Sequence, residues 1–438
     1  MRRAAIGYLA RMNPRTLLSG LIHARRDRAA AMPFIMMTAL IDMIAIGLII
    51  PVLPALVGQL TGSQTDQAFW YGTATFAFSI ANFVMAPVLG ALSDSYGRRP
   101  VLLIGFSGLA ISFLSTSVVA SMPALIGIRV ISGAMQANLS VANAYVADIT
   151  PPEQRAKRFG MLGAMFGVGF ILGPVLGGLL GAINLRLPFA VAGSLALLNL
   201  LYGCFVLPES LPVERRHAFS LRTANTFSAL RRLTELRGVG RLAAVLALCG
   251  LAQFTMYTSW VLFTTFKFGW GPLQNGWSLA AVGVTGALVQ GVLLGRLLQR
   301  FSARRLAVLG LVSSTLAYAL FGAATRSWMM FAIIFANLLG STVAPAFQSI
   351  ISSAADESSQ GKTMGAVSGI NSLMAVLAPL FSAPLLTAVS HLPRGDWRIG
   401  APFFFCALLQ ACGLVLTFQY FRSHRGIVPA PRGVEESG

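Results

Sequence analysis

Twelve apolar stretches fill most of the chain and constrain its fold more than any other feature. A helix needs about 20 predominantly apolar residues to cross the roughly 30 Å hydrocarbon core of a bilayer, and each stretch is near that length. They cover residues 33–57, 69–92, 100–119, 122–147, 158–181, 187–207, 241–266, 277–298, 305–323, 327–351, 362–388 and 400–421. The sequence therefore predicts an all-α membrane protein with twelve transmembrane helices.

The composition agrees with a membrane protein and argues against other classes. Hydrophobic residues make up 55% of the chain and charged residues 11%, whereas a soluble domain has about 25% charged residues. The net charge is +19, but the basic residues are scattered between the apolar stretches, which indicates cytoplasmic loops rather than a nucleic-acid interface. All four cysteines fall inside apolar stretches, all four histidines fall outside them, and no HExxH or CxxC motif occurs. We therefore expect no disulfide framework, metal site, cofactor or enzymatic activity.

The basic residues also predict which side of the membrane each loop occupies. With the N-terminus in the cytoplasm, 27 of the 33 Lys and Arg residues lie on the cytoplasmic side. The exceptions are Arg129, inside a stretch, and Arg186, Lys267, Arg326, Arg394 and Arg398, on the far side. Because cytoplasmic loops carry the excess of positive charge, we expect both termini in the cytoplasm.

A repeated loop divides the chain into two halves. GALSDSYGRRPVLLIG, Gly90–Gly105, returns in weakened form as GRLLQRFSARRLAVLG, Gly295–Gly310, with Arg99 and Arg304 in register. An internal repeat at near half-length predicts two pseudo-symmetric six-helix halves. The expected domains are a basic cytoplasmic tail at 1–32, an N-terminal six-helix bundle at 33–207, a cytoplasmic linker at 208–240, a C-terminal six-helix bundle at 241–421 and a cytoplasmic tail at 422–438.

The first copy of this loop has the residues of a tight, charged turn. Asp94 and Arg98 stand four residues apart, the spacing at which a carboxylate and a guanidinium pair on a helical turn. Gly90 and Gly97 permit close backbone approach or a positive φ. Arg99 adds a second guanidinium directly after Arg98.

Asp42 is the one acidic residue deep within an apolar stretch. It lies about 13 Å below the start of its helix at 1.5 Å per residue, near the membrane midplane. A carboxylate there faces a cavity or a partner, and desolvation favours its protonated form, as a proton-coupled carrier requires. Arg129 in the fourth stretch is the natural partner and shares a helical face with Gln136. The alternative interpretations are a structural hydrogen bond for Asp42 and a static salt bridge for Arg129.

Small and polar residues in other stretches supply further candidates. The fifth stretch is crowded with glycines and contains one proline. Closely spaced small residues let two helices touch, and a proline can bend a helix. This stretch is therefore either a hinge or proton seal, or a site of tight helix packing only. Its residues are Gly169, Gly173, Pro174, Gly177 and Gly178. The candidates for a substrate cavity are Asn82, Gln136, Gln253, Tyr257, Gln290 and Asn337.

Together these motifs resemble the major facilitator superfamily, and within it the tetracycline-resistance type of drug/proton antiporter. GALSDSYGRRPVLL is similar to the loop between helices two and three of the superfamily, and RVISG from Arg129 resembles the proton-coupling motif of helix four. GVGFILGPVLGG, Gly167–Gly178, resembles the antiporter motif of helix five. Asp42 followed by PVLP (Pro51–Pro54) is similar to the first-helix pattern. Similarity to the tetracycline exporters specifically lies in AYVADIT (Ala144–Thr150), LPES (Leu207–Ser210) and ATRSWM (Ala324–Met329). The resemblance covers about residues 33–421.

The resemblance implies a monomeric carrier of the bacterial inner membrane that alternates between inward- and outward-open states. It implies export of a small, drug-like molecule driven by entering protons, with neither a cofactor nor a nucleic-acid partner. Asp42 and Arg129 are then expected to link protonation to the change of state. The Asp94 loop is expected to latch the inward-closed arrangement.

The sequence departs from the tetracycline exporters at positions that handle the drug. Where those exporters have a third-helix acid, a histidine and a further acid, this chain has Ser112, Gly286 and Ser314, and Ser95 replaces a usual arginine. Because these losses weaken recognition of a charged metal–tetracycline chelate, we expect a less polar substrate. An exporter of an endogenous metabolite or siderophore, and a non-transporting receptor or scaffold, are the alternatives.

Overall fold

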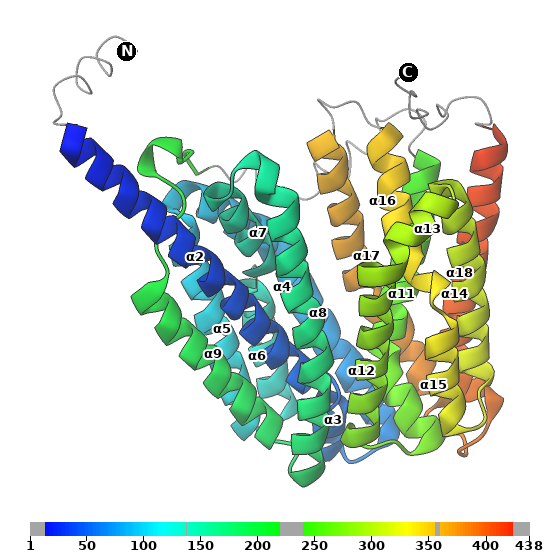
Figure 1. Ribbon diagram of the computed structural model, residues 1–438. Helices are drawn as coiled ribbons and strands as arrows, with labels where there is room; N and C mark the ends of the chain where they lie inside the picture. The colour runs from blue at the N-terminus through cyan, green and yellow to red at the C-terminus, as the bar shows by residue number, and fades with distance from the viewer. Residues whose placement is uncertain (1–13, 137, 220–239, 355–359, 424–438) are drawn as a thin grey trace.

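The computed structural model describes residues 14–136, 138–219, 240–354 and 360–423, and every regular element in these ranges is helical (Figure 1). Parts of the predicted N-terminal tail (1–13), linker (220–239) and C-terminal tail (424–438) lie outside the described residues. Eleven helices are long and apolar enough to cross a membrane, and one bent pair makes a twelfth span. The all-α, twelve-span fold is therefore confirmed.

The N-terminal half builds six spans from eight helices. Two of its spans are broken: α2 and α3 form one span from Met32 to Thr61, and α6 and α7 form another from Met122 to Ile149. Pro51 falls in the first break, where its missing N–H ends the helical hydrogen bonding. The helices are α2 Pro14–Ile49, α3 Leu53–Thr61, α4 Gln64–Tyr96, α5 Arg98–Val118, α6 Met122–Met135, α7 Asn138–Ile149, α8 Pro152–Ile183 and α9 Leu187–Val206.

The C-terminal half follows the same plan. Its second span, Pro272–Arg300, contains a π-helical turn, and its fourth span bends by 45° between Ala336 and Leu339. The short helix η1, Val213–Arg215, precedes this half. The elements are α11 Gly240–Phe268, α12 Pro272–Leu288, η2 Val289–Leu293, α13 Leu294–Arg300, α14 Ala303–Ala323, α15 Ser327–Ala336, η3 Leu339–Thr342, α16 Val343–Ala354, α17 Gln360–Val389, η4 Trp397–Gly400 and α18 Ala401–Ser423.

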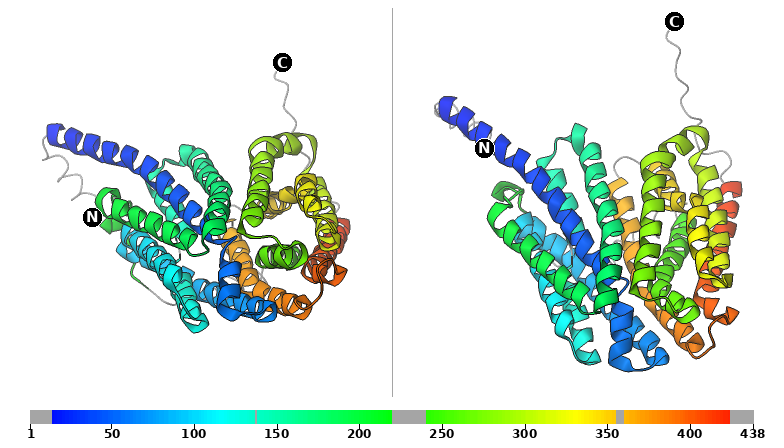
Figure 2. Two further views of the ribbon diagram at one scale, coloured as in Figure 1. Left: turned by 90° about the horizontal axis from the view of Figure 1, so that it is seen from below. Right: turned by 60° about the horizontal axis from the view of Figure 1, so that its bottom comes forward.

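The two halves lie side by side and meet along two helix pairs, α8 with α12 and α4 with α17 (Figures 1 and 2). Figure 1 shows the halves converging at the end away from the chain termini and diverging toward the end that carries them. Each half has its own apolar core, with clusters around Phe106 and Phe113 in the first half and around Phe347 and Phe403 in the second. The cluster around Phe403 also includes Ala68 of α4, with Ile50 and Tyr71 packed against it, so apolar packing continues from one half into the other.

Backbone contact closes the end away from the termini. A Cβ atom built on Gly178 of α8 would lie 2.7 Å from the carbonyl oxygen of Pro272, and one on Gly276 of α12 would clash with the carbonyl of Pro174. Small residues at both positions therefore let α8 and α12 touch backbone to backbone. At the same end Thr65 Oγ1 and Ser390 Oγ are 2.8 Å apart, a hydrogen bond between α4 and the residue after α17.

We predict that Gly178→Val separates the halves at this end, because the added side chain meets backbone that cannot yield without moving a helix. Overpacking of this kind costs about 1–3 kcal/mol. In a cysteine-free background, spin labels at Thr65→Cys and Ser390→Cys should show a longer distance in the variant. Gly160→Val is the matched control on the same helix, because a Cβ there has nothing within 4 Å. Equal distances in both variants would contradict the assignment of this contact.

Candidate functional site

A cavity of about 250 Å³ lies inside the N-terminal half, between α2, α3, α4, α5 and α6. Most of its wall is aliphatic or aromatic, with one guanidinium and a few hydroxyl and amide groups. Such a mixture suits an amphipathic organic molecule. The lining residues are Ile46, Ile49, Ile50, Leu53, Tyr71, Thr75, Phe78, Leu109, Phe113, Arg129, Ser132 and Gln136.

Arg129 of α6 is the charged residue of this wall, and it is only 5% exposed. Its Nη2 donates to Thr116 Oγ1 of α5 at 3.5 Å, a long hydrogen bond, and its Nε has no partner among the described residues. Since a guanidinium carries five N–H donors and does not lose its charge, a buried one requires acceptors. Arg129 therefore has donor capacity left for an oxygen atom of water or of a ligand in the cavity.

The break between α6 and α7 shapes the wall beside Arg129. Asn82 Nδ2 of α4 donates to the carbonyls of Gly133, at 3.3 Å, and Gln136, at 2.5 Å. The Gly133 carbonyl also accepts from the backbone N–H of Gln136 at 3.3 Å, in the turn where the helix ends at Met135. The structure thus brings together two residues that the sequence assigned to the cavity, Gln136 in its wall and Asn82 behind it.

Asp42 is 4% exposed and faces α9. Its carboxylate Oδ1 accepts a hydrogen bond of 3.0 Å from Asn199 Nδ2, and the same amide nitrogen lies 3.5 Å from the carbonyl of Thr38. The two charged residues that the sequence paired thus hydrogen-bond to different helices, Asp42 to α9 and Arg129 to α5. Asn199 was not among the sequence candidates, although an amide within the apolar stretch 187–207 was a signal that pointed to it.

The charged loop between α4 and α5 forms a compact network at the terminal end. Arg98 donates to Asp94 Oδ1 at 2.5 Å, to Ser93 Oγ at 2.7 Å and, through Nε, to Asp148 Oδ2 of α7 at 3.0 Å. The ion pair that the spacing of Asp94 and Arg98 predicts is therefore present. The Asp94 side chain is 51% exposed, so its carboxylate stays accessible at this end.

A second acid, Glu209, holds the start of α5. Its carboxylate accepts hydrogen bonds from the backbone N–H groups of Arg98, at 2.9 Å, and Arg99, at 3.2 Å. Gly97 has a φ of 110°, and a Cβ there would clash with Glu209. Gly90 lies inside α4 with open space around it, so of the two loop glycines Gly97 is the one whose conformation requires glycine. Glu209 and Asp148 appeared at the sequence level only as members of LPES and AYVADIT.

The glycine-rich helix α8 packs closely against two neighbouring helices, α2 and α12. Gly169, Gly173 and Gly177 face α2, and a Cβ on Gly173 would lie 2.7 Å from the Cα of a glycine in that helix. Gly178 and the backbone carbonyl of Pro174 face α12, whereas the Pro174 ring lies against Gly47 of α2. One helix therefore contacts both the span that carries Asp42 and the opposite half.

The cavity candidates of the second half lie apart from the cavity around Arg129. Gln253 Oε1 accepts from Tyr318 at 3.4 Å, Tyr257 is 44% exposed, and Asn337 Oδ1 accepts from Ser313 at 2.8 Å. Gln290 lies in the π-helical turn η2 and is exposed. None of these four lines the cavity of the first half.

At three positions this chain lacks the charged drug-handling residues expected from the resemblance to the tetracycline exporters. Ser112 is buried in α5 without a hydrogen bond for its Oγ among the described residues, Ser314 is buried in α14, and Gly286 of α12 faces open space. Among the described residues, no group of three His, Cys, Asp or Glu could hold a metal ion. The lining of the cavity likewise has no acidic side chain to bind a cation.

Comparison with known proteins gives consistent matches over most of the chain. The family model of the Major Facilitator Superfamily matches residues 35–290 and 242–437. The class C tetracycline resistance protein of Escherichia coli is 37% identical over 379 residues, which covers 86% of this chain and 95% of that protein. The structure of the human organic anion transporter MFSD10 is 25% identical, with a TM-score of 0.66 over 89% of this chain and 99% of that one. The nucleoside transporter NupG is 13% identical, with a TM-score of 0.74 over 90% and 100% of the two chains.

We predict that Gly97→Ala destabilises the loop network, because alanine disfavours the positive φ and its Cβ displaces the Glu209 carboxylate. The expected loss is about 1–3 kcal/mol, as for other strained backbone positions. Gly90→Ala is the matched control, and helix propensity predicts that it is neutral or stabilising by up to about 1 kcal/mol. Thermal unfolding in detergent measures both. An unchanged Tm for Gly97→Ala would show that the loop relaxes without loss.

Proposed function

The chain belongs to the major facilitator superfamily, and we propose that it is a proton-coupled secondary transporter that exports drug-like small molecules by alternating access. The observation that carries this proposal is the cavity whose largely apolar wall contains the buried guanidinium of Arg129. A scaffold has no use for such a group, whereas a carrier needs a polar anchor in an otherwise apolar pocket. The similarity to a tetracycline resistance protein over 86% of the chain supports export as the direction of transport.

We infer that the contact between α8 and α12 at one end of the molecule belongs to a state that is open to the cytoplasm at the other end. The excess of basic residues favours cytoplasmic termini, so the end closed by α8 and α12 faces outward. The halves diverge toward the terminal end (Figure 1). In this state the protein accepts cargo from the cytoplasm, and the exposed carboxylate of Asp94 is available to latch that end in the opposite state.

The amide of Asn199 lets Asp42 carry a proton without losing its partner. The ionised carboxylate accepts from Nδ2, as observed, whereas a protonated carboxyl group can donate to Oδ1, which has no partner among the described residues. Protonation therefore changes the hydrogen bond between α2 and α9. Because α2 also packs on the glycine face of α8, a shift of α2 reaches the closed end through α8 and α12. Arg129 holds the polar part of the cargo.

The cavity favours a substrate that is less polar than a metal–tetracycline chelate. Its lining has no carboxylate for a chelated cation, and Ser112, Gly286 and Ser314 supply no charge. An endogenous metabolite of similar polarity would use the same cavity and the same coupling, and it is the second candidate cargo. The proposed transport cycle includes no catalytic step. Partners other than substrate, protons and lipid are not required, and a monomer suffices because the cavity lies within one half.

The domain division follows from this proposal. The two bundles at 33–207 and 241–421 move relative to each other, the segment 208–240 connects them in the cytoplasm, and the tails 1–32 and 422–438 lie on the same side. The strap from Leu207 to Ser210 belongs functionally to the first bundle, because Glu209 binds the start of α5 and the carbonyl of Pro208 accepts from Tyr145 at 2.9 Å.

We predict that Asp42→Asn inserts and folds but loses proton-coupled export. Asparagine preserves the size of the side chain and its hydrogen bond to Asn199, but it cannot bind and release a proton. Purified protein in liposomes with an imposed proton gradient should show proton flux when a transported compound is added. A suitable panel contains tetracycline with magnesium, lipophilic cations and neutral antibiotics. The flux triggered in wild type should fall to background in the variant.

Asp66→Asn is the control for this experiment, since Asp66 is an exposed acid near the closed end, bound by Ser63 at 2.6 Å. It should retain wild-type flux. Uphill export by Asp42→Asn at the wild-type rate would show that Asp42 is not required for proton coupling. Wild-type flux with the neutral compounds, but not with the chelate, would support the less polar substrate class.

A further inference from the structure

One buried positive charge dominates the polar wall of the cavity in the first half. The hydroxyl of Thr75 donates to the backbone carbonyl of Tyr71 at 2.8 Å, so it is left as an acceptor. The hydroxyl of Thr116 is likewise an acceptor for Arg129, because its own proton goes to the carbonyl of Ser112 at 2.7 Å. Among the described residues the Arg129 guanidinium makes one hydrogen bond, of 3.5 Å, although it carries five N–H donors. The cavity therefore presents a cationic donor to its occupant.

The described residues that line the cavity place no carboxylate against this guanidinium. The lining includes neither Asp nor Glu. Asp42, the acid of the same bundle, accepts from Asn199 of α9 and is not part of the lining. A buried charge is costly unless it is paired, so an anionic group in the cavity is favoured by the charge that is already there. A cationic group would instead meet a like charge in a poorly solvated space.

The cavity also limits the size of its occupant. Its volume is about 250 Å³, which is below the range of about 300–1,000 Å³ for the pockets of drug-sized ligands. Most of its wall is apolar, with side chains such as Ile46, Leu109 and Phe113. A molecule with one or two rings and a single acidic group fits both the volume and the polarity.

Two residues of the cavity wall also touch the opposite half. Ile50 and Tyr71 line the cavity and pack against the apolar cluster that contains Phe403 of the second half. Tyr71 belongs to α4, one of the helices along which the two halves meet. An occupant of the cavity therefore lies beside side chains that must repack when the halves move.

We propose that this cavity binds a small amphipathic carboxylate, which rests on the proposed transport function and names the class of its cargo. The carboxylate accepts charge-assisted hydrogen bonds from Arg129, which are stronger than those of neutral pairs. The apolar body of the molecule lies against Ile46, Leu109 and Phe113.

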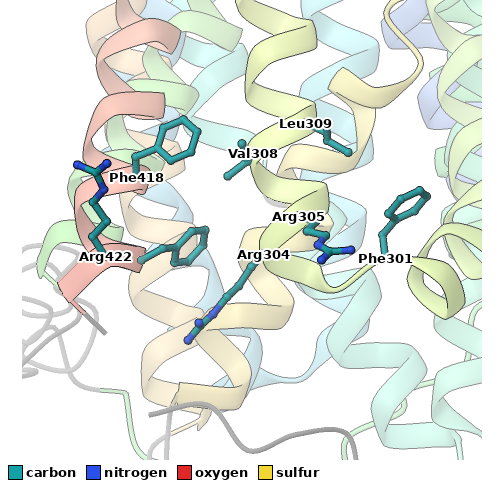
Figure 3. A pocket seen from close by; sticks show the side chains of 8 residues that line it. Phe301, Arg304, Arg305, Val308, Leu309, Phe418 and Arg422 are labelled. Atoms are coloured by element: carbon teal, nitrogen blue, oxygen red, sulfur yellow. The ribbon is translucent and has the colours of Figure 1, made fainter. Parts of the chain in front are cut away.

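The arginines on the outer flank of the second half do not form an equivalent site. A groove of about 620 Å³ there is lined in part by Arg304, Arg305 and Arg422, but Figure 3 shows their guanidinium groups pointing apart. Arg305 and Arg422 are exposed, so solvent and salt screen their charges. Arg305 therefore serves as a control for general attraction of anions to a chain whose net charge is +19.

Isothermal titration calorimetry of the full-length protein in detergent at neutral pH tests the cargo class without a proton gradient. The probes are naphthalene carboxylate, naphthalene carboxamide and naphthylmethylamine, which share a ring system and are anionic, neutral and cationic. The carboxylate should bind about tenfold or more tightly than the amide, as expected for hydrogen bonds to a charged group, and the amine should bind more weakly than the amide. This comparison needs no variant, so it does not depend on the folding of a mutant.

Arg129→Gln should weaken carboxylate binding by about tenfold or more and leave amide binding nearly unchanged. Arg129→Lys keeps the charge and should preserve the order of the three probes, with a weaker carboxylate because an ammonium group lacks the planar fork. Ile46→Phe fills the cavity without changing its charge and should weaken the carboxylate and the amide alike. Arg305→Gln removes a positive charge from the exposed flank and should leave all three affinities unchanged.

Four results would each overturn the proposal. They are equal binding of the three probes, no measurable binding of the carboxylate, an equal loss in Arg305→Gln and Arg129→Gln, and wild-type carboxylate binding by Ile46→Phe. Because the measurement is made at equilibrium without a gradient, such a result would refute the cargo class alone. Export itself would still be decided by the flux assay with Asp42→Asn.

Discussion

The interior of a bilayer offers the backbone no hydrogen-bond partner, and this constraint decides where the spans of this protein can break. The fourth span of the first half breaks at Gln136 because Asn82 supplies a donor to the freed carbonyls. The fourth span of the second half bends by 45° at Asn337, whose side chain is held by Ser313. Polar residues in these spans therefore fix the shape of a helix as well as the polarity of the space beside it. The cavity around Arg129 exists because such a break could be satisfied from within the protein.

The features that could be predicted from the sequence are those that a short window of residues determines. A transmembrane helix depends on the length of one apolar stretch, so all twelve spans could be located. The Asp94–Arg98 pair depends on a spacing of four residues and was equally accessible. The family followed from motifs of this local kind, and the comparisons confirm it.

The partners of the buried groups depend on which helix faces which, and a nearly uniformly apolar helix gives little periodic signal about its orientation. For that reason the sequence paired Arg129 with Asp42 but did not predict that Arg129 donates to Thr116 or that Asp42 accepts from Asn199. The same difficulty applies to Glu209, whose role at the start of α5 joins residues more than a hundred positions apart. The glycines in α8 predicted close packing, but the sequence did not show that neighbouring positions of this helix contact two different helices, α2 and α12.

The two ends of the molecule contain different kinds of contact. The closed end joins the two halves, whereas the ion pairs at the terminal end lie within the first half. At the closed end, the contact between halves includes glycine backbone against Pro272, one pair of hydroxyl groups and apolar packing around Ala68, and none of the ion pairs found among the described residues joins the halves there. The terminal end carries the network of Asp94, Arg98 and Asp148. Dissolved salt screens exposed charges over about 10 Å at 0.1 M but has little effect on close-packed apolar contacts. Ionic strength therefore acts on the two ends unequally: it weakens the partly exposed ion pairs of the first half at the terminal end and leaves the packed contact between the halves at the closed end almost unchanged.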